Sequence, residues 1–181
     1  MKWVGARRSP VARERSPSHH LARPVVWRRA RQGMLHAMST HERSDTWWRS
    51  FVLEAPARTA KLAIMRADGA PHIAPVWVDI DDDQIVFLTS ATTLKGRAII
   101  RDPRVSMCWD DERPPFTFVT VAGIASTSTD ADQLLYWATR IAGRYMGPDR
   151  AEEYGRRNAV PSELLVRVTP TRIFGARGIA D

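Results

Sequence analysis

Short apolar runs separated by polar turns make up most of the chain after residue 60. The segments 60–67 and 72–80 flank Asp68-Gly69, a pair typical of a β-hairpin turn. In the second segment the even-numbered residues from Ala74 to Ile80 are apolar, which predicts a strand with one buried face. Further strands are predicted over 84–89, 105–109, 116–127, 164–168 and 171–174.

Helical spacing replaces this alternation in a few stretches. Apolar residues within 47–53 fall on one face of a short helix. Asp130 is a favourable N-cap for a second helix over 131–146, which Gly147-Pro148 ends, and a charged helix follows over 150–157. Six or seven short strands, mostly joined by hairpins, with helices inserted before the last ones, predict an antiparallel barrel with accessory helices.

Candidate chemistry is concentrated in the stretch 84–105. A strand ends in the hydroxyl-rich loop 89–93, and a helix then opens around Lys95-Gly96-Arg97 and stops before Pro103. The N–H groups of the first helical turn, the helix dipole and two cations favour a bound phosphate. The hydroxyls and Arg97 would add donors, and Gly96 would leave room for close approach. A lysine on a helix surface is the structural alternative for Lys95, although the chain has only three lysines.

The net charge of +7 would raise nucleic acid as a partner, but its distribution argues otherwise. Residues 1–40 hold nine basic residues and one acid, which leaves 18 basic and 19 acidic residues in 41–181. We interpret 1–40 as a disordered basic extension, with a basic arm for nucleic acid or an anionic surface, or an organelle-targeting peptide, as alternatives. Residues 41–181 are expected to form one domain.

Other function classes find little support in the sequence. The single cysteine, Cys108, lies in an apolar strand and is expected to be a core side chain. Only His41 and His72 occur after residue 40, so no metal site is expected, and no serine stands in a hydrolase motif. Neither a run of about 18 apolar residues nor a secretory signal is present, which favours a cytoplasmic protein without membrane association.

The order of motifs resembles the pyridoxamine 5'-phosphate oxidase-like split β-barrel proteins. The resemblance begins with TAKLAIMRADGAPHIAPVWV (59–78) and QIVFLTSATTLKGRAIIRDPRVSM (84–107), and continues with RYMGPDRAEEYGRRN (144–158) and LLVRVTPTRIFG (164–175). Within these proteins, the chain is most similar to the branch that uses the deazaflavin coenzyme F420. The resemblance implies a mainly β fold with accessory helices, a six-stranded antiparallel Greek-key split barrel. It also implies a homodimer with the cofactor at the subunit interface.

The resemblance also carries over site residues. The strand matching 73–78 would lie against the cofactor ring, and the segment matching 89–97 would bind the phosphate-bearing side chain. The expected cofactor-binding residues are Pro75, Val76, Trp77, Thr89, Ser90, Thr93, Lys95, Gly96 and Arg97. Two positions depart from the pattern, because Ala98 stands where many relatives have Asn, and Ala122 where many have Glu.

The expected function is that of an F420-dependent oxidoreductase. Reduced F420 would pass a hydride to an unsaturated or conjugated small molecule, and the sequence names no catalytic residue. An FMN-dependent oxidoreductase is the first alternative, since Lys95 and Arg97 would hold the FMN phosphate equally well. A cofactor carrier or sensor without turnover is the second. A nucleic-acid binder using residues 1–40 is disfavoured by the nearly neutral body.

Overall fold

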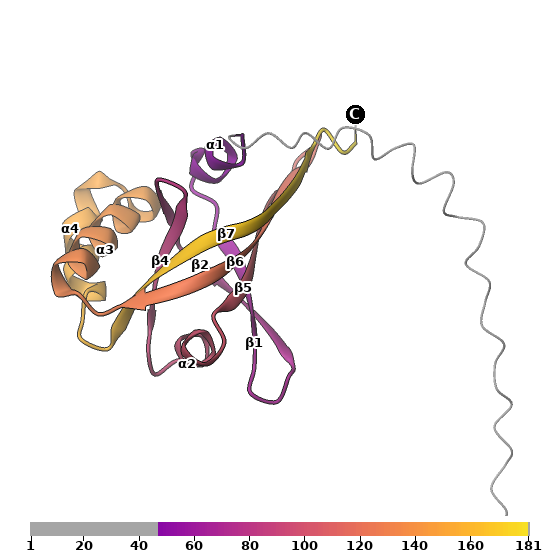
Figure 1. The fold of residues 1–181 in the computed structure, drawn as a ribbon. Coiled ribbons are helices and arrows are strands. Elements are labelled where there is room, and N and C mark those ends of the chain that lie inside the picture. Colours follow the sequence, from indigo (N-terminus) through magenta and orange to yellow (C-terminus); the bar gives the residue numbers. More distant parts are fainter. Residues whose placement is uncertain (1–46, 181) are drawn as a thin grey trace, which may run out of the picture. The chain divides into compact units, whose positions relative to one another are not determined.

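The computed structural model describes residues 47–180 (Figure 1). The basic extension predicted over 1–40 lies outside the described residues, so its character and the boundary at 40 stay predictions.

A single antiparallel sheet forms the body of the described chain. Its seven strands are β1 (Ala60–Met65), β2 (Pro71–Val76), β3 (Asp79–Asp81), β4 (Gln84–Ser90), β5 (Arg104–Asp111), β6 (Thr117–Ser128) and β7 (Glu163–Arg177). They pair in the order β2-β1-β5-β6-β7-β4-β3. The outermost strands, β2 and β3, are consecutive in the chain with only Trp77 and Val78 between them, so the two edges of the sheet meet at this corner. The mainly β fold with accessory helices is therefore confirmed.

The strand expected over 72–80 is two strands, because its alternation breaks. The pattern places Asp79 on the same face as Ile73 and Pro75, which are exposed. Instead Val78 and Asp79 are both buried, which requires the chain to turn between β2 and β3. This corner accounts for the seventh strand.

The two strands expected at the C-terminal end are one long strand, β7. Proline has no N–H for a ladder, which argues for a break at Pro170. In the structure Pro170 pairs with Gly123 of β6, where the register shifts by a bulge. A Cβ on Gly123 would lie 2.7 Å from the carbonyl oxygen of Thr169, so only glycine allows the two backbones to approach this closely.

Four helices accompany the sheet: α1 (Trp47–Leu53), α2 (Leu94–Arg101), α3 (Ala131–Met146) and α4 (Ala151–Asn158), the last preceded by a 3₁₀ turn (Pro148–Arg150). The predicted helices over 47–53 and 131–146 are confirmed with the same bounds. The Asp130 carboxylate accepts a hydrogen bond from the N–H of Gln133 at 2.8 Å, as expected of an N-cap. Helices α3 and α4 lie together on the β4 side of the sheet (Figure 1).

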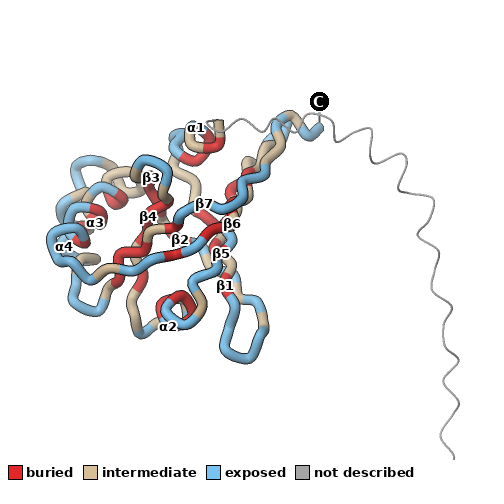
Figure 2. The backbone as a smooth tube through the Cα atoms, in the orientation of Figure 1, coloured by how far each residue is buried: buried red, intermediate tan, exposed pale blue. Residues whose placement is uncertain are grey.

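Two apolar cores hold these elements together. The larger fills the barrel and includes Leu62, Phe87 and Trp109, with Trp48 of α1 closing one end. The smaller joins Val86 and Leu165 to Leu134 and Trp137 of α3, so β4 and β7 are buried on both faces where α3 covers them (Figure 2). Cys108 does not join either core; it is half-buried on the opposite face of β5 from Met107 and Trp109, so the core prediction for this thiol is wrong.

Candidate functional site

A pocket of about 420 Å³ lies beside the corner between β2 and β3. Seven of the nine residues predicted to bind a cofactor line it: Pro75, Val76, Trp77, Thr89, Ser90, Thr93 and Lys95. They come from the end of β2, the end of β4 and the first turn of α2. The other seven lining residues were not predicted from the sequence: Leu88, Ala138, Ile141, Arg157, Asn158, Val160 and Glu163. Most of these belong to α3, α4 and the connection to β7.

Trp77, which lines the pocket, is held by an aromatic stack with Tyr145. The rings of Trp77 and Tyr145 are 4.9 Å apart and inclined by only 4°. The Tyr145 hydroxyl donates to the carbonyl of Arg58 at 2.8 Å and accepts from the N–H of Val78 at 3.1 Å. Burial raises the pKa of Tyr145, so the phenol keeps its proton and can donate. These two hydrogen bonds fix Tyr145, and with it the orientation of Trp77.

A buried ion pair holds α3 against the same corner. Asp79 is 2 % exposed, and its carboxylate accepts from Arg140 at 2.8 Å and Arg144 at 2.9 Å. It also accepts from the N–H of Ile80 at 2.8 Å. Arg144 donates in addition to the carbonyl of Val52 in α1 at 3.0 Å. The arginines lie more than 60 residues from Asp79 in the chain, so no local pattern could reveal this pairing.

The hydroxyls of the loop 89–93 shape the loop itself. Thr93 caps α2, because its Oγ1 accepts from the N–H of Gly96 at 3.1 Å and donates to the carbonyl of Ser90 at 2.8 Å. Thr89 Oγ1 lies 3.2 Å from Thr93 Oγ1 and is therefore the donor of that pair. Ser90 Oγ donates to the carbonyl of Ser162 at 3.2 Å. The protons of these hydroxyls are thus already used, which leaves the N–H groups of Leu94 and Lys95 at the helix start for an anion.

Gly96 and Arg97 do not line the pocket. Gly96 is buried, and a Cβ there would lie 2.2 Å from the carbonyl oxygen of Ser90, so this glycine makes room for the protein's own backbone rather than for a ligand. Arg97 donates to the carbonyl of Thr92 and lines a separate hollow with Arg66 and Arg101. Residues separated by two positions along an α-helix are about 200° apart around its axis, so Lys95 and Arg97 point to different sides of α2.

The charges left in the pocket come from three side chains. Lys95 has no hydrogen bond or ion pair within residues 47–180, and the guanidinium of Arg157 lies 5.5 Å from the ring of Tyr154. Burial raises the pKa of Glu163, an effect that the positive charge of Lys95 opposes. The pocket is therefore net positive whether or not Glu163 is ionised, and more so when the carboxyl is neutral.

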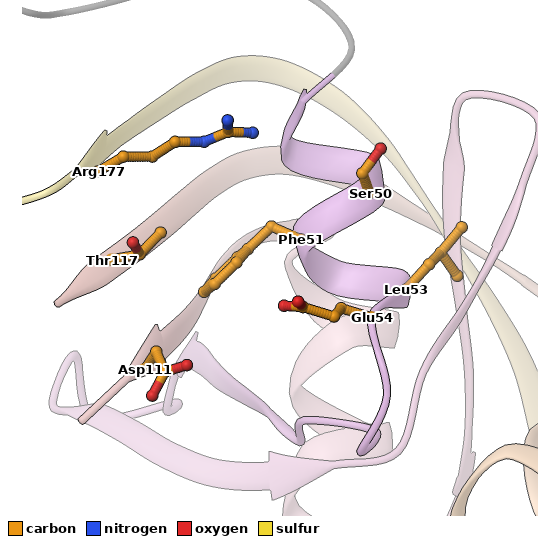
Figure 3. Close-up of a pocket in the computed structure, with 7 residues that line it drawn as sticks. All are labelled: Ser50, Phe51, Leu53, Glu54, Asp111, Thr117 and Arg177. Atoms are coloured by element: carbon orange, nitrogen blue, oxygen red, sulfur yellow. The ribbon is translucent and has the colours of Figure 1, made fainter. Parts of the chain in front are cut away.

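A larger hollow, of about 560 Å³, lies under α1 (Figure 3). Its lining residues are Ser50, Phe51, Leu53, Glu54, Asp111, Thr117 and Arg177. Arg58 bridges the two carboxylates, with 2.9 Å to Glu54 and 2.9 Å to Asp111, and Arg113 also pairs with Asp111. Hydrogen bonds from these arginines hold the pKa of Asp111 well below its usual range. The two acids that line this hollow, Glu54 and Asp111, are thus already neutralised by arginines. None of the nine predicted cofactor-binding residues lies here.

Within residues 47–180, no group of three metal-ligating side chains comes together, and no helix is long and apolar enough to cross a membrane.

Comparison with known proteins adds a relationship in sequence. The family model described as pyridoxamine 5'-phosphate oxidase matches residues 48–176. A pyridoxine/pyridoxamine 5'-phosphate oxidase of Rhizobium johnstonii is 34% identical over 89 residues, which cover 48% of this chain and 42% of that protein. The match therefore spans less than half the length of this curated relative.

Solved structures with the same fold include two at 25% sequence identity. A conserved hypothetical protein from Mycobacterium tuberculosis superposes with a TM-score of 0.68, covering 77% of this chain and 88% of that chain. An F420 reductase superposes with a TM-score of 0.57, covering 68% of this chain and 94% of that chain.

Proposed function

The chain belongs to the pyridoxamine 5'-phosphate oxidase family, and from this membership we propose that it is an oxidoreductase with a flavin-type cofactor. The family resemblance inferred from the sequence is thereby confirmed. The observation that carries the proposal is the pocket beside the β2–β3 corner, where Lys95 and the start of α2 face residues of β2 and β4. The binding roles of these residues remain predictions.

The side chains of this pocket fit a planar cofactor with a phosphate. Its volume of about 420 Å³ is within the roughly 300–1,000 Å³ of small-molecule sites. Val76, Leu88 and Ile141 offer apolar surface, while Lys95 and the free N–H groups of α2 offer donors to an anion. A bound flavin or deazaflavin would supply hydride chemistry. The chain's own residues would bind the phosphate, orient the ring against 75–77 and exclude water.

We propose F420 as the cofactor and an unsaturated or conjugated small molecule as the substrate. The support is the shared fold and 25% identity with an F420 reductase. FMN is the second candidate. The family model is that of an oxidase, and Lys95 would suit the phosphate of FMN as well as that of F420. A carrier or sensor without turnover is the third.

A homodimer is part of the same proposal. The outer face of the sheet exposes apolar side chains on several strands, including Met65 of β1, Ile73 of β2 at 66% exposure, and Ile124 of β6. Exposed apolar side chains on one sheet face are typical of a surface that a second copy covers. Light scattering with size exclusion would show a particle of twice the chain mass, whereas a monomer at micromolar concentration would contradict the proposal.

Titration of the purified protein with F420 and with FMN, followed by fluorescence, tests the cofactor. Binding of F420 with reduction of an acceptor from a broad panel supports the first candidate. Binding of FMN alone rejects F420, and binding of F420 without any acceptor reduction favours the carrier. Absence of binding to either compound rejects a flavin-type function.

Replacing Lys95 with glutamine should weaken cofactor binding by about 1.5–3 kcal/mol, because a charged hydrogen bond to the phosphate is lost. Fluorescence titration measures this loss. Arg156→Gln, which removes the same charge from the exposed face of α4, is the control and should leave affinity unchanged. Equal affinity of the Lys95→Gln variant and the wild type would show that the phosphate lies elsewhere.

Replacing Glu163 with glutamine should remove a pH dependence of cofactor binding. The pKa of Glu163 is raised above its ordinary 4.5, mainly by burial, with Lys95 partly opposing. Below this raised pKa the carboxyl is neutral, and above it the carboxylate repels a phosphate, so wild-type affinity should fall as pH rises through it. The variant should keep its affinity over that window. Glu152→Gln, on the exposed face of α4, should retain the wild-type profile. Identical profiles for Glu163→Gln and wild type would exclude this role.

A further inference from the structure

We propose that a second hollow beside α2, the arginine pocket formed around Arg66, Arg97 and Arg101, binds an oxyanion that carries at least two negative charges. This site is separate from the pocket beside the β2–β3 corner, which contains Lys95 and is called the Lys95 pocket below. It goes beyond the proposed oxidoreductase function. It also gives a role to Arg97, which the sequence singled out but which the Lys95 pocket does not contain.

The arginine pocket has a volume of about 260 Å³ and lies between the β1–β2 turn and the outer side of α2. Arg66 comes from the turn, whereas Arg97 and Arg101 are one helical turn apart on α2 and so lie on the same side of it. Leu94 and Ala98 complete the wall from the helix. Three arginines from the turn and the helix therefore line one small hollow.

Neutral acceptors hold two of these guanidinium groups in place. Arg97 donates to the backbone carbonyl of Thr92, and Arg101 donates to the backbone carbonyl of Met65. Neither arginine forms an ion pair with any residue of the described chain, 47–180. A guanidinium has five N–H donors in a rigid fork, so each still has donors for a ligand. Carbonyl contacts orient the groups without cancelling their charge, which prepares them for an anion.

The turn that carries Arg66 is itself well fixed. The N–H of Arg66 donates to the carbonyl of Ala70 at 2.9 Å, and Gly69 donates to the carbonyl of Arg66 at 3.1 Å. Gly69 has a φ of 81°, a conformation that glycine adopts without strain. The side chain of Asp68 accepts from the N–H of Ala70 at 3.1 Å. The turn thus presents Arg66 from a defined backbone.

The charge balance decides the class of ligand. Asp68 is the one acid that lines the pocket, and it pairs with Arg66 at 2.9 Å. The nearby Asp102 pairs with Arg104 instead and does not line the pocket. Three arginines and one aspartate leave two uncompensated positive charges, which a phosphate or a polycarboxylate would match. Both anions accept the paired N–H donors of a guanidinium.

Calorimetric titration of the full chain with inorganic phosphate and with citrate, at low salt, tests this site. The Lys95→Gln variant is titrated alongside the wild type, because phosphate can also enter the Lys95 pocket. Saturable binding that persists in Lys95→Gln supports the proposal. Phosphate alone would indicate a phosphorylated ligand, citrate alone a polycarboxylate, and both a general oxyanion site.

Two further variants must shift this binding in opposite directions. The double variant Arg97→Gln, Arg101→Gln should weaken it at least about tenfold, whereas Asp68→Asn should tighten it, because the opposing charge is removed and the turn acceptor is kept. Arg156→Gln serves as the charge control. Failure of both anions to bind Lys95→Gln overturns the site, as does unchanged affinity in a folded double variant or weaker binding in Asp68→Asn. Loss of cofactor binding alone would reject the oxidoreductase proposal and leave this site intact.

Discussion

Replacing Gly96 with alanine should lower the free energy of unfolding by about 3 kcal/mol, at the upper end of overpacking costs. A Cβ at this position would lie 2.2 Å from the carbonyl oxygen of Ser90 and 2.9 Å from the Cα of Ala91. Both atoms belong to the backbone, so no side chain can rotate away to relieve the clash. Helix α2 must therefore move away from the end of β4. Because Lys95 is the preceding residue on α2, the same shift should reduce cofactor affinity.

Chemical denaturation of Gly96→Ala beside Gly143→Ala measures this cost with a matched control. Both glycines lie within helices, but a Cβ on Gly143 would meet the Cβ of Ala151 at 3.5 Å, an ordinary contact. Alanine is the better helix former, so Gly143→Ala should raise stability by about 0.5–1 kcal/mol. Opposite signs for the same chemical change would establish the packing role of Gly96. If both variants were equally stable, the close approach of α2 to β4 would be refuted.

Replacing Asp79 with alanine should lower the free energy of unfolding by about 3 kcal/mol, because two arginines lose their buried counter-ion. The value stands at the low end for broken buried pairs, since the side chain of Arg140 is 49% exposed and can rehydrate. Arg144 is more enclosed, with a side chain that is 16% exposed, and would keep its hydrogen bond to the carbonyl of Val52, so it bears most of the loss. The docking of α3 on the β2–β3 corner should loosen as a result.

Thermal and denaturant unfolding, together with near-ultraviolet circular dichroism of the Trp77–Tyr145 stack, report both effects. Asp83→Ala is the control, because Asp83 also pairs with an arginine, Arg49, but is highly exposed. Exposed pairs contribute about 0.2–1 kcal/mol, so this variant should unfold almost as the wild type does. An equal decrease in the free energy of unfolding for Asp79→Ala and Asp83→Ala would mean that the burial of Asp79 adds nothing to the stability that its ion pairs provide.

Features set by neighbouring residues were predictable from the sequence. The bounds of α3 follow from Asp130, the apolar spacing and Gly147, all within one segment. The hairpin at Asp68-Gly69 follows from turn chemistry, and strands β1 and β2 pair around it. In each case the signal that determines the element lies inside the element.

Features that depend on distant partners were not predictable in the same way. Asp79 turns inward because Arg140 and Arg144 meet it from α3. Pro170 stays within β7 because this strand bulges at Thr171, next to the pair that Pro170 forms with Gly123 of β6. Arg157, Asn158 and Glu163 enter the Lys95 pocket only through the way α4 packs. The separation of Lys95 from Arg97 is different, since helical periodicity alone would have indicated it.

The two-residue link between β2 and β3 also determines how backbone amides exchange with solvent hydrogen. Among the described strands, β2 and β3 each have a ladder partner on one side only, so the outward N–H groups of these strands have no ladder partner and can exchange without a ladder bond breaking. The amide of Val78, inside the link, is instead held by the hydroxyl of Tyr145. Its exchange therefore requires this hydrogen bond to break, which happens whenever α3 detaches from the barrel. The exchange rate of this single amide thus sets an upper limit on how often the helix detaches.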